Sequence, residues 1–318
     1  MSFISKRLVP AVAPVVAGLS VASAAAHDLH NLTHPSNTGP DAALSMTGPG
    51  AVDPPTRSII VNSSKWPLGY TLKVCFYEGG PQARQAIAAE AQKWLAGANL
   101  KMDFGAAPAL RTCATQPAPS GRYEDIRISF RGAGHWSYIG VDSHRLTGPS
   151  MNLQNFDVLP ELDDYSKAVV IHEFGHAIGL HHEHQSPGSP CDREFNLPAV
   201  KQLTGWNDQQ ITTNFAMLER NSSAYTWGPY DPKSVMMYSL PVQVFHNGAQ
   251  SPCWVQQNYS ISAEDRSSLR KAYPGAPSAA LSVAQRTRSA DSVIANSALP
   301  ADVRNRAWIQ KLLVEDMQ

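Results

Sequence analysis

The pattern of hydrophobic and polar positions predicts a sheet of short strands packed against helices. The segment Tyr70–Tyr77 alternates between apolar and polar side chains, which is typical of a half-buried strand. A Gly-Gly-Pro turn ending at Pro81 then opens a helix, because proline suits the first helical turn. The apolar residues that this helix places on one face are Ile87, Ala91, Trp94 and Leu95. Four further short strands are expected between Gly, Pro and Ser turns: Leu100–Phe104, Asp125–Phe130, His135–Ile139 and Met151–Phe156.

Capping residues mark two more helices. Asp163 or Asp164 can accept hydrogen bonds from the free N–H groups at the start of a helix over Tyr165–Leu180. The side chains of that helix expected in the core are Ala168, Val169, Ile171 and Ile178. A later helix, Ser262–Tyr273, begins with a capping serine and two acidic residues and stops at a Pro-Gly pair. Between the two, Gln185–Val255 has few periodic runs, which indicates a loop-rich subdomain held by a disulfide.

The order of these elements predicts an α+β fold, with an N-terminal mixed β-sheet and two long helices followed by a loop-rich C-terminal subdomain. We expect one globular domain over residues 58–275, divided into subdomains 58–182 and 183–275. Residues 276–318 are predicted to form a flexible, Ala/Ser-rich tail, in which Pro300–Met317 could form one short amphipathic helix.

The first residues have the form of a secretory signal. Lys6 and Arg7 precede a short apolar run, Leu8–Ala22, which is followed by small residues. A membrane anchor would need about 20 uninterrupted apolar residues, and prolines and a glycine break this run. We therefore expect a signal peptide over residues 1–26 and a secreted, extracellular protein. Residues 27–57 are rich in Pro, Gly and Ser and are expected to form a disordered leader or a short propeptide.

The charge balance of the chain argues against two classes of partner. Lysine plus arginine and aspartate plus glutamate both total 26, so the formal net charge is zero. Such a chain creates no long-range field that would attract nucleic acid or an anionic membrane surface. No later segment is long and apolar enough to span a bilayer. We therefore expect neither nucleic-acid nor membrane partners, and a protein that acts as a monomer.

The chain contains four cysteines, and an even number in an exported protein favours disulfides over free thiols. Three pairings are possible. The pairing of Cys75 with Cys113 and of Cys191 with Cys253 is preferred, because each bridge then lies within one half of the sequence.

The stretch HEFGHAIGLHHEH, residues 172–184, has the spacing of a metal site. On a helix, His172 and His176 lie one turn apart and about 40° apart in projection, so both imidazoles can reach one ion. Glu173 projects to the neighbouring side, where it can hold a metal-bound water without being a ligand. Gly179 permits the left-handed backbone that ends the helix, so that His182 can approach from another direction.

Three imidazoles and one water would complete the tetrahedron of a catalytic zinc ion, one per chain. The alternative is a structural zinc site, but such a site normally closes its fourth position with Cys or His, and the motif contains no cysteine. His181 and His184 flank the third histidine, but their spacing does not match the motif. We expect them to be exposed loop residues and not ligands.

The motif HExxHxxGxxH is that of the metzincin metallopeptidases, and local features make the chain similar to the astacin family within that group. These are Glu183 directly after the third histidine, the Met-turn segment Ser234–Tyr238, the edge-strand segment Gly134–Gly140 and the signature Asn214-Phe215. The resemblance covers Ser64–Tyr273 and implies a metzincin-like fold.

The resemblance also implies roles for single residues. Met236 would lie beneath the metal and support it. Tyr238 would be a fifth zinc ligand that moves away on substrate binding and donates a hydrogen bond to the tetrahedral oxyanion, a task that suits a phenol. A tyrosine at this position occurs in astacins and serralysins but not in matrixins, and the chain lacks the calcium-binding repeats of serralysins. The residues of the substrate-binding edge strand would be His135, Trp136, Ser137 and Tyr138.

The chain departs from the family pattern at three places. His135 stands where the family has a cysteine, and the partner cysteine is missing, so the family's disulfide pattern cannot be assumed. The loop after the third histidine matches the family only in part, through a distant Asp192-Arg193. The leader lacks the FxGD segment whose aspartate occupies the zinc in the family's zymogens, and nothing selects Asp41 or Asp53 in its place.

These features predict a secreted zinc endopeptidase that hydrolyses internal bonds of protein or peptide substrates. Glu173 would take a proton from the zinc-activated water and pass it to the leaving amine. Substrates would lie extended and antiparallel to His135–Ile139, because an edge strand offers unpaired backbone groups. One alternative is a secreted zinc-containing binding module without peptidase activity. Another is a different zinc metallopeptidase lineage, in which Tyr238 would lie outside coordination range of the metal.

Overall fold

The computed structural model describes residues 59–218, 220, 225–275 and 283–317. The expected signal peptide and leader lie outside the described residues. Among the residues that are described, no helix has the length and apolar character needed to cross a membrane.

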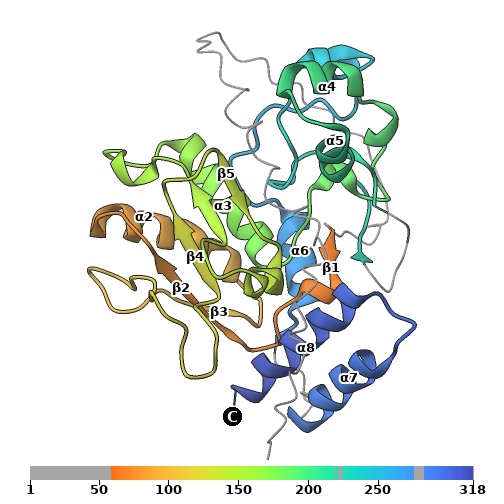
Figure 1. Cartoon of the computed structure of the whole chain (residues 1–318). Helices are drawn as coiled ribbons and strands as arrows, with labels where there is room; N and C mark the ends of the chain where they lie inside the picture. The colour runs from red at the N-terminus through yellow and green to blue at the C-terminus, as the bar shows by residue number, and fades with distance from the viewer. Residues whose placement is uncertain (1–58, 219, 221–224, 276–282, 318) are drawn as a thin grey trace, which may run out of the picture.

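A five-stranded sheet organises the N-terminal half, as Figure 1 shows. Its strands are β2 (Thr71–Phe76), β3 (Lys101–Asp103), β4 (Ile126–Ser129), β5 (His135–Ser137) and β6 (Met151–Leu153). Their order is β3-β2-β4-β6-β5, and all neighbours are parallel except β5, which runs antiparallel to β6. All five predicted strands are confirmed, although each is slightly shorter than its hydrophobic run. The mixed sheet is therefore the one expected, with β5 at its edge.

Two long helices pack against each other and against this sheet. Helix α2 (Pro81–Gln92) has Pro81 in its first turn and buries Ile87 and Ala91, as its periodicity predicts. Helix α3 (Asp164–Ala177) begins where the carboxylate of Asp163 accepts a hydrogen bond from the backbone N–H of Ser166 at 2.7 Å. The indole N–H of Trp94, just after α2, donates to the carbonyl of Ile171 on α3 at 2.8 Å and ties the two helices together.

The C-terminal half has little regular structure, as expected. Its elements are α4 (Leu197–Thr204), α5 (Asp208–Phe215), β7 (Tyr225–Thr226) and α6 (Ala263–Ala272). Strand β7 pairs with β1 (Ile60–Val61) from the start of the described chain. The connecting 3-10 turns are η1 (Asn62–Ser64), η2 (Lys93–Leu95), η3 (Gly140–Arg145), η4 (Phe156–Val158), η5 (Glu183–Gln185), η6 (Cys191–Arg193), η7 (Val242–Val244) and η8 (Gly248–Gln250).

Two disulfides stabilise the two halves separately. The structure joins Cys75 to Cys113 in the sheet region and Cys191 to Cys253 in the C-terminal half, so the preferred pairing is confirmed. The second bridge lies in its own apolar cluster, around Phe195, Phe215 and Phe245, separate from the core beneath the sheet. A small cluster of this kind gains from a cross-link, because the bridge lowers the conformational entropy of the unfolded chain.

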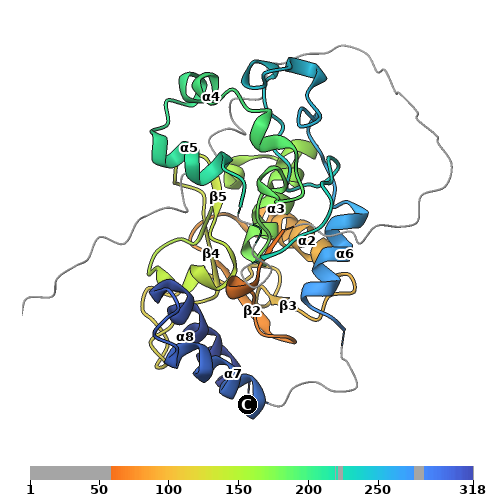
Figure 2. The ribbon, with the colours of Figure 1, turned by 90° about the vertical axis from the view of Figure 1, so that its right-hand side faces the viewer.

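The last residues differ from the flexible tail predicted for them. Residues 283–315 form a helical hairpin of α7 (Val283–Ala295) and α8 (Ala301–Glu315), seen side by side in Figures 1 and 2 at the end of the molecule opposite α4. Helix α8 is the amphipathic helix expected over Pro300–Met317, and the side chains that it buries are Ala307, Ile309, Leu313 and Val314. The low hydrophobicity of this Ala/Ser-rich segment suggested a flexible tail. Alanine is nevertheless the strongest helix former, which favours the helix α7.

Candidate metal centre

Helix α3 and the turn that follows it bring three histidines together. His172 and His176 lie one turn apart on α3, and Gly179, just beyond the helix end, has a φ of +104°. The N–H groups of Gly179 and Leu180 donate to the carbonyls of His176 and Gly175 at 2.8 and 2.9 Å, which closes the helix end. The expected left-handed backbone at Gly179 is therefore present, and it turns the chain so that His182 faces the helix.

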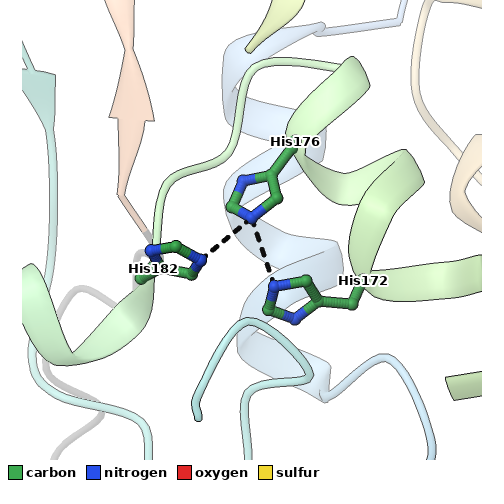
Figure 3. Close-up of side chains that lie close together, drawn as sticks. All are labelled: His172, His176 and His182. Atoms are coloured by element: carbon green, nitrogen blue, oxygen red, sulfur yellow. Dashed lines mark hydrogen bonds between the residues drawn. The ribbon is translucent and has the colours of Figure 1, made fainter. Parts of the chain in front are cut away.

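The three imidazoles converge through their Nε2 atoms, as Figure 3 shows. The Nε2 atom of His176 lies 3.2 Å from that of His172 and 3.1 Å from that of His182. All three side chains are buried, and in the part of the chain that the structure describes they form the one cluster of His, Cys or acidic groups with metal-site spacing. Tetrahedral zinc with Zn–N bonds of about 2.05 Å places its ligand nitrogens about 3.3 Å apart. The spacing therefore fits one zinc ion.

Each ring uses its other nitrogen to bond an oxygen acceptor. The Nδ1 atom of His172 lies 2.8 Å from the carbonyl of Val235, and that of His176 lies 2.9 Å from the carbonyl of Leu180. The Nδ1 atom of His182 lies 3.1 Å from Oε1 of Gln185. Since oxygens accept the Nδ1 protons, each neutral ring presents a lone pair on Nε2. Three converging lone pairs repel one another, and a cation among them removes that repulsion.

Burial favours the neutral form of the His172 ring. Desolvation lowers the pKa of His172 to about 4, well below the ordinary value for histidine. A neutral imidazole is the form that binds a metal, so the site is prepared to bind one at neutral pH.

Gln185 is a site residue that the sequence did not reveal. Its side-chain N–H group donates to the carbonyls of Thr213 and Ala216 at 2.9 and 3.1 Å, which fixes Oε1 toward His182. The only available signal was a polar residue three positions after the third histidine. Its partners lie about 30 residues further along the chain, so no local pattern could indicate the role.

Replacing Gln185 by alanine should weaken zinc binding about 10- to 100-fold, because the orientation and basicity of His182 depend on this acceptor. The zinc Kd can be measured by competition with a chromogenic chelator. Gln243→Ala changes an exposed glutamine on η7 and should bind zinc like the wild type. An unchanged Kd for Gln185→Ala would show that His182 is oriented without it.

The segment Ser234–Tyr238 lies beside the histidine cluster. Met236 is fully buried, and its thioether lies so close to Gly175 on α3 that any Cβ there would overlap it. The ring of Tyr238 is also buried, with its centroid 4.2 Å from that of His182 and 6.0 Å from that of His172. The Met-turn expected from the sequence thus lies beside the site.

A buried carboxylate holds this turn in place. Asp265, in the first turn of α6, accepts hydrogen bonds from the hydroxyl of Ser234 at 2.7 Å and the backbone N–H of Val235 at 2.9 Å. The carbonyl of Val235 in turn accepts the Nδ1 proton of His172. The start of α6, predicted from its capping residues, therefore also positions the metal site.

The two glutamates of the motif lie in different places. Glu173 is fully buried on α3, and desolvation raises its pKa well above the ordinary value. Burial raises the pKa of Tyr238 well above the ordinary value, and the negative charge of Glu173 adds to that shift. The Oε1 atom of Glu183 accepts the backbone N–H of Asp231 at 2.9 Å, and the Glu183 N–H donates to the carbonyl of Met236 at 3.0 Å. Glu183 therefore supports the loop beneath the histidines.

The expectation that both flanking histidines are exposed is wrong, because His181 is half-buried and His184 is buried. Its ring is fully buried, its Nε2 lies 2.7 Å from the carbonyl of Asn214, and burial lowers its pKa to about 3. The cause is the aromatic cluster of the C-terminal half, where its centroid lies 5.6 Å from that of Phe215. The Nδ1 atom of His181 accepts the backbone N–H of His182. Neither ring joins the metal-site cluster.

The strand proposed to face substrate lies at the edge of the sheet. Strand β5 pairs with β6 on one side and contacts α3. Its side chains alternate, so that His135 and Ser137 are buried while Trp136 and Tyr138 are half-buried. His135 packs on Phe156 with ring centroids 4.7 Å apart, and burial lowers its pKa to about 4. The histidine that replaces the family's cysteine is therefore a neutral core residue.

The parallel sheet with an antiparallel edge strand, the three-histidine cluster and the Met-turn define a metzincin-like zinc metallopeptidase domain. Residues 107–264 match the family model described as Astacin, a peptidase family, so the resemblance found in the motifs is confirmed and the domain is that of an astacin-like zinc metalloendopeptidase. The structure of myroilysin is similar at a TM-score of 0.56 and 28% identity, covering 69% of this chain and 100% of that one.

A curated relative matches over a shorter segment. Protein SpAN of Strongylocentrotus purpuratus is 31% identical over 120 residues, which cover 34% of this chain and 15% of that protein. This chain therefore matches only a small part of the length of SpAN.

Proposed function

We propose that the protein is a secreted endopeptidase that hydrolyses internal peptide bonds with one zinc ion bound by His172, His176 and His182. The observation that carries this proposal is the convergence of three buried Nε2 atoms whose rings have committed their Nδ1 protons to oxygen acceptors. Without a metal ion this arrangement costs free energy, because it brings nitrogen lone pairs together in an apolar interior. It is the arrangement of a metal site with neutral ligands.

A zinc ion held there would lower the pKa of a bound water towards about 7 and polarise the scissile carbonyl. Glu173 is the general base in this proposal. Burial raises the pKa of its carboxyl group, which favours acceptance of the proton from the attacking water. The same carboxyl group then passes that proton to the leaving amine, so the reaction needs no covalent intermediate.

Tyr238 is proposed as a further metal ligand in the resting enzyme and as the donor to the tetrahedral oxyanion. Burial and the charge of Glu173 raise the pKa of its phenol well above the ordinary value, so the hydroxyl keeps its proton at neutral pH. A protonated phenol in an apolar site is a strong donor to a developing negative charge.

Replacing Tyr238 by phenylalanine should lower kcat about 100-fold and leave KM within a few-fold, because the lost hydrogen bond forms only in the transition state. Steady-state hydrolysis of an internally quenched peptide gives both constants. Tyr259→Phe alters an exposed tyrosine and should leave both unchanged. If Tyr238→Phe retains full kcat, the residue is merely a packing partner of His182.

Peptide substrates are proposed to bind along β5, extended and antiparallel to it. The free side of this strand offers backbone groups for strand addition, and its half-buried side chains, Trp136 and Tyr138, would contact the substrate. Binding of this kind holds the backbone of a peptide on both sides of the cleaved bond, which suits an endopeptidase.

Export is proposed from the first 26 residues, with residues 27–57 as a leader that precedes the catalytic domain over 58–275. The two disulfides support this, since such bridges persist in oxidising compartments. We also propose that the enzyme acts as a monomer on protein or peptide substrates.

The test uses the purified secreted chain and a library of internally quenched peptides. Metal analysis should give one zinc per chain, a chelator should abolish cleavage, and added zinc should restore it. Sequencing of the products should place the cuts at internal bonds. A protein that binds zinc tightly but cleaves no peptide of the library would instead be a zinc-containing binding module.

A further inference from the structure

A cavity lies between the helical hairpin α7–α8 and the rest of the domain, and none of the three histidines lines it. Its volume is about 700 Å³, within the range of about 300 to 1,000 Å³ usual for small-molecule sites. Three segments line it: the loop 62–68, the end of α6 up to Pro274, and the facing sides of α7 and α8. All of these residues lie outside the segment 107–264 that matches the family model.

The walls combine apolar surface with positive charge. Apolar residues of the lining include Trp66, Leu68, Pro274, Val293, Val303 and Val314. The charged residues of the lining are Lys65, Lys271 and Arg286, and no carboxylate contributes to it among the described residues. A cavity with apolar walls and basic side chains is complementary to a molecule with an apolar body and an anionic head group.

Among the basic side chains of the lining, Lys65 is the one proposed to bind the anionic head group. Its side chain is half-buried at the cavity, and no described acidic group lies within 4.0 Å of its ammonium. Burial lowers the pKa of this lysine, because no nearby negative charge compensates for the water it has lost. An anion placed beside it would supply that compensation.

The cavity walls are held by specific bonds across the junction. Arg286 of α7 donates to the carbonyl of Leu68 at 3.0 Å, and Gln310 of α8 donates to the carbonyl of Lys65 at 2.8 Å. Arg306 of α8 forms two hydrogen bonds to the carboxylate of Asp142, at 2.8 and 2.9 Å. The hairpin is therefore docked at several points, and the cavity is a formed site and not a loose gap.

We propose that this cavity binds an amphipathic carboxylate, a single aliphatic chain that ends in one carboxylate group. The carboxylate lies beside Lys65, and the aliphatic chain lies against the apolar side chains between α7 and α8. This site is independent of zinc and of peptide hydrolysis, so its test does not depend on the proposed function.

The test compares three probes that share a twelve-carbon chain and differ in the head group: dodecanoate, dodecanol and dodecyltrimethylammonium. Binding to the full chain is measured by calorimetry below the concentration at which each probe self-associates. Dodecanoate should bind at least about tenfold more tightly than the other two, because only its head group compensates Lys65. Octanoate and decanoate should bind progressively more weakly, by up to about fourfold for each methylene lost.

Two variants locate the site. Lys65→Gln should weaken dodecanoate binding about tenfold and leave dodecanol unaffected, whereas Lys101→Gln, an exposed lysine on β3, should change neither. Val293→Trp should fill the cavity and abolish binding, and Ser292→Trp, on the exposed side of α7, should not. The melting temperature measured without probe shows whether each variant is folded. If Val293→Trp does not fold, the result for Lys65→Gln decides the test.

Absence of dodecanoate binding to the full chain would overturn the proposal, whether the cavity is closed or filled by another part of the chain. Equal affinity for the three probes would also overturn it, since the site would then be apolar without selecting an anion. Binding that survives both Lys65→Gln and Val293→Trp would place the ligand elsewhere.

Discussion

Replacing Glu173 by glutamine is expected to lower kcat for peptide hydrolysis about 10³- to 10⁴-fold while one zinc ion remains bound. The amide has the volume of the carboxyl group but cannot accept the proton of the attacking water, and a positioned base contributes typically about 10² to 10⁴ in rate. The histidines proposed as zinc ligands are three other side chains, His172, His176 and His182. The oxygen acceptors of their Nδ1 atoms are not changed by the substitution. Cleavage of an internally quenched peptide, together with metal analysis of the same sample, measures both quantities.

A matched control is Glu90→Gln, which changes a buried glutamate on α2 that is paired with Lys93 and lies away from the histidine cluster. This variant should cleave at the wild-type rate. Wild-type cleavage by Glu173→Gln would refute the proposed base, and loss of zinc from that variant would mean that the carboxylate helps to hold the ion. The two results are distinguished by the metal content.

The part of the site that could be predicted lies in one short stretch of sequence. His172, His176, Gly179 and His182 are positioned by the geometry of one helix and one turn, so their spacing is sufficient to place them. The same holds for the strands, because each is a hydrophobic run bounded by turn residues. The disulfide pairing also followed from position, since each bridge closes a loop within one half of the chain.

The parts that could not be predicted depend on contacts between distant segments. Gln185 orients His182 only because α5 and the residue that follows it supply two carbonyls to its side chain. The burial of His184 arises from aromatic residues that come together in the fold. Helix α7 is rich in polar residues, and its position depends on docking of the hairpin through Arg306 and Gln310 of α8. Tertiary contacts of this kind leave no periodic signal in the sequence.

Asp142, which lies shortly after the edge strand β5, forms hydrogen bonds with residues near both ends of the described chain. Arg306 binds Asp142, whose carboxylate accepts a hydrogen bond from the hydroxyl of Ser64 at 3.3 Å. Asp142 lies in η3, which begins two residues after Tyr138 and so follows directly on the strand proposed to bind substrate. The junction of η1, η3 and α8 is therefore a point where a local defect should weaken the whole domain, and a single glycine lies at its centre.

Gly140→Ala should destabilise the fold by about 2 to 5 kcal/mol. Gly140 has a φ of +51°, where an L-residue costs about 1 to 2 kcal/mol, and a Cβ there would overlap the backbone carbonyl oxygen of Ser64. Relief of that overlap requires η1 and η3 to separate, which adds about 1 to 3 kcal/mol of overpacking. Urea unfolding of the zinc-free protein, followed by circular dichroism, measures the loss without a contribution from bound metal.

Two other glycines separate the causes of this loss. Gly205 has a φ of +69° with nothing within 4 Å of a Cβ, so Gly205→Ala should show the backbone cost alone, about 1 kcal/mol. Gly148 lies outside the left-handed region and also has open space, so Gly148→Ala should stay within about 0.5 kcal/mol of the wild type. If Gly140→Ala costs no more than Gly205→Ala, the close approach of η3 to Ser64 does not exist in solution, and the hairpin then cannot hold the edge strand through that junction.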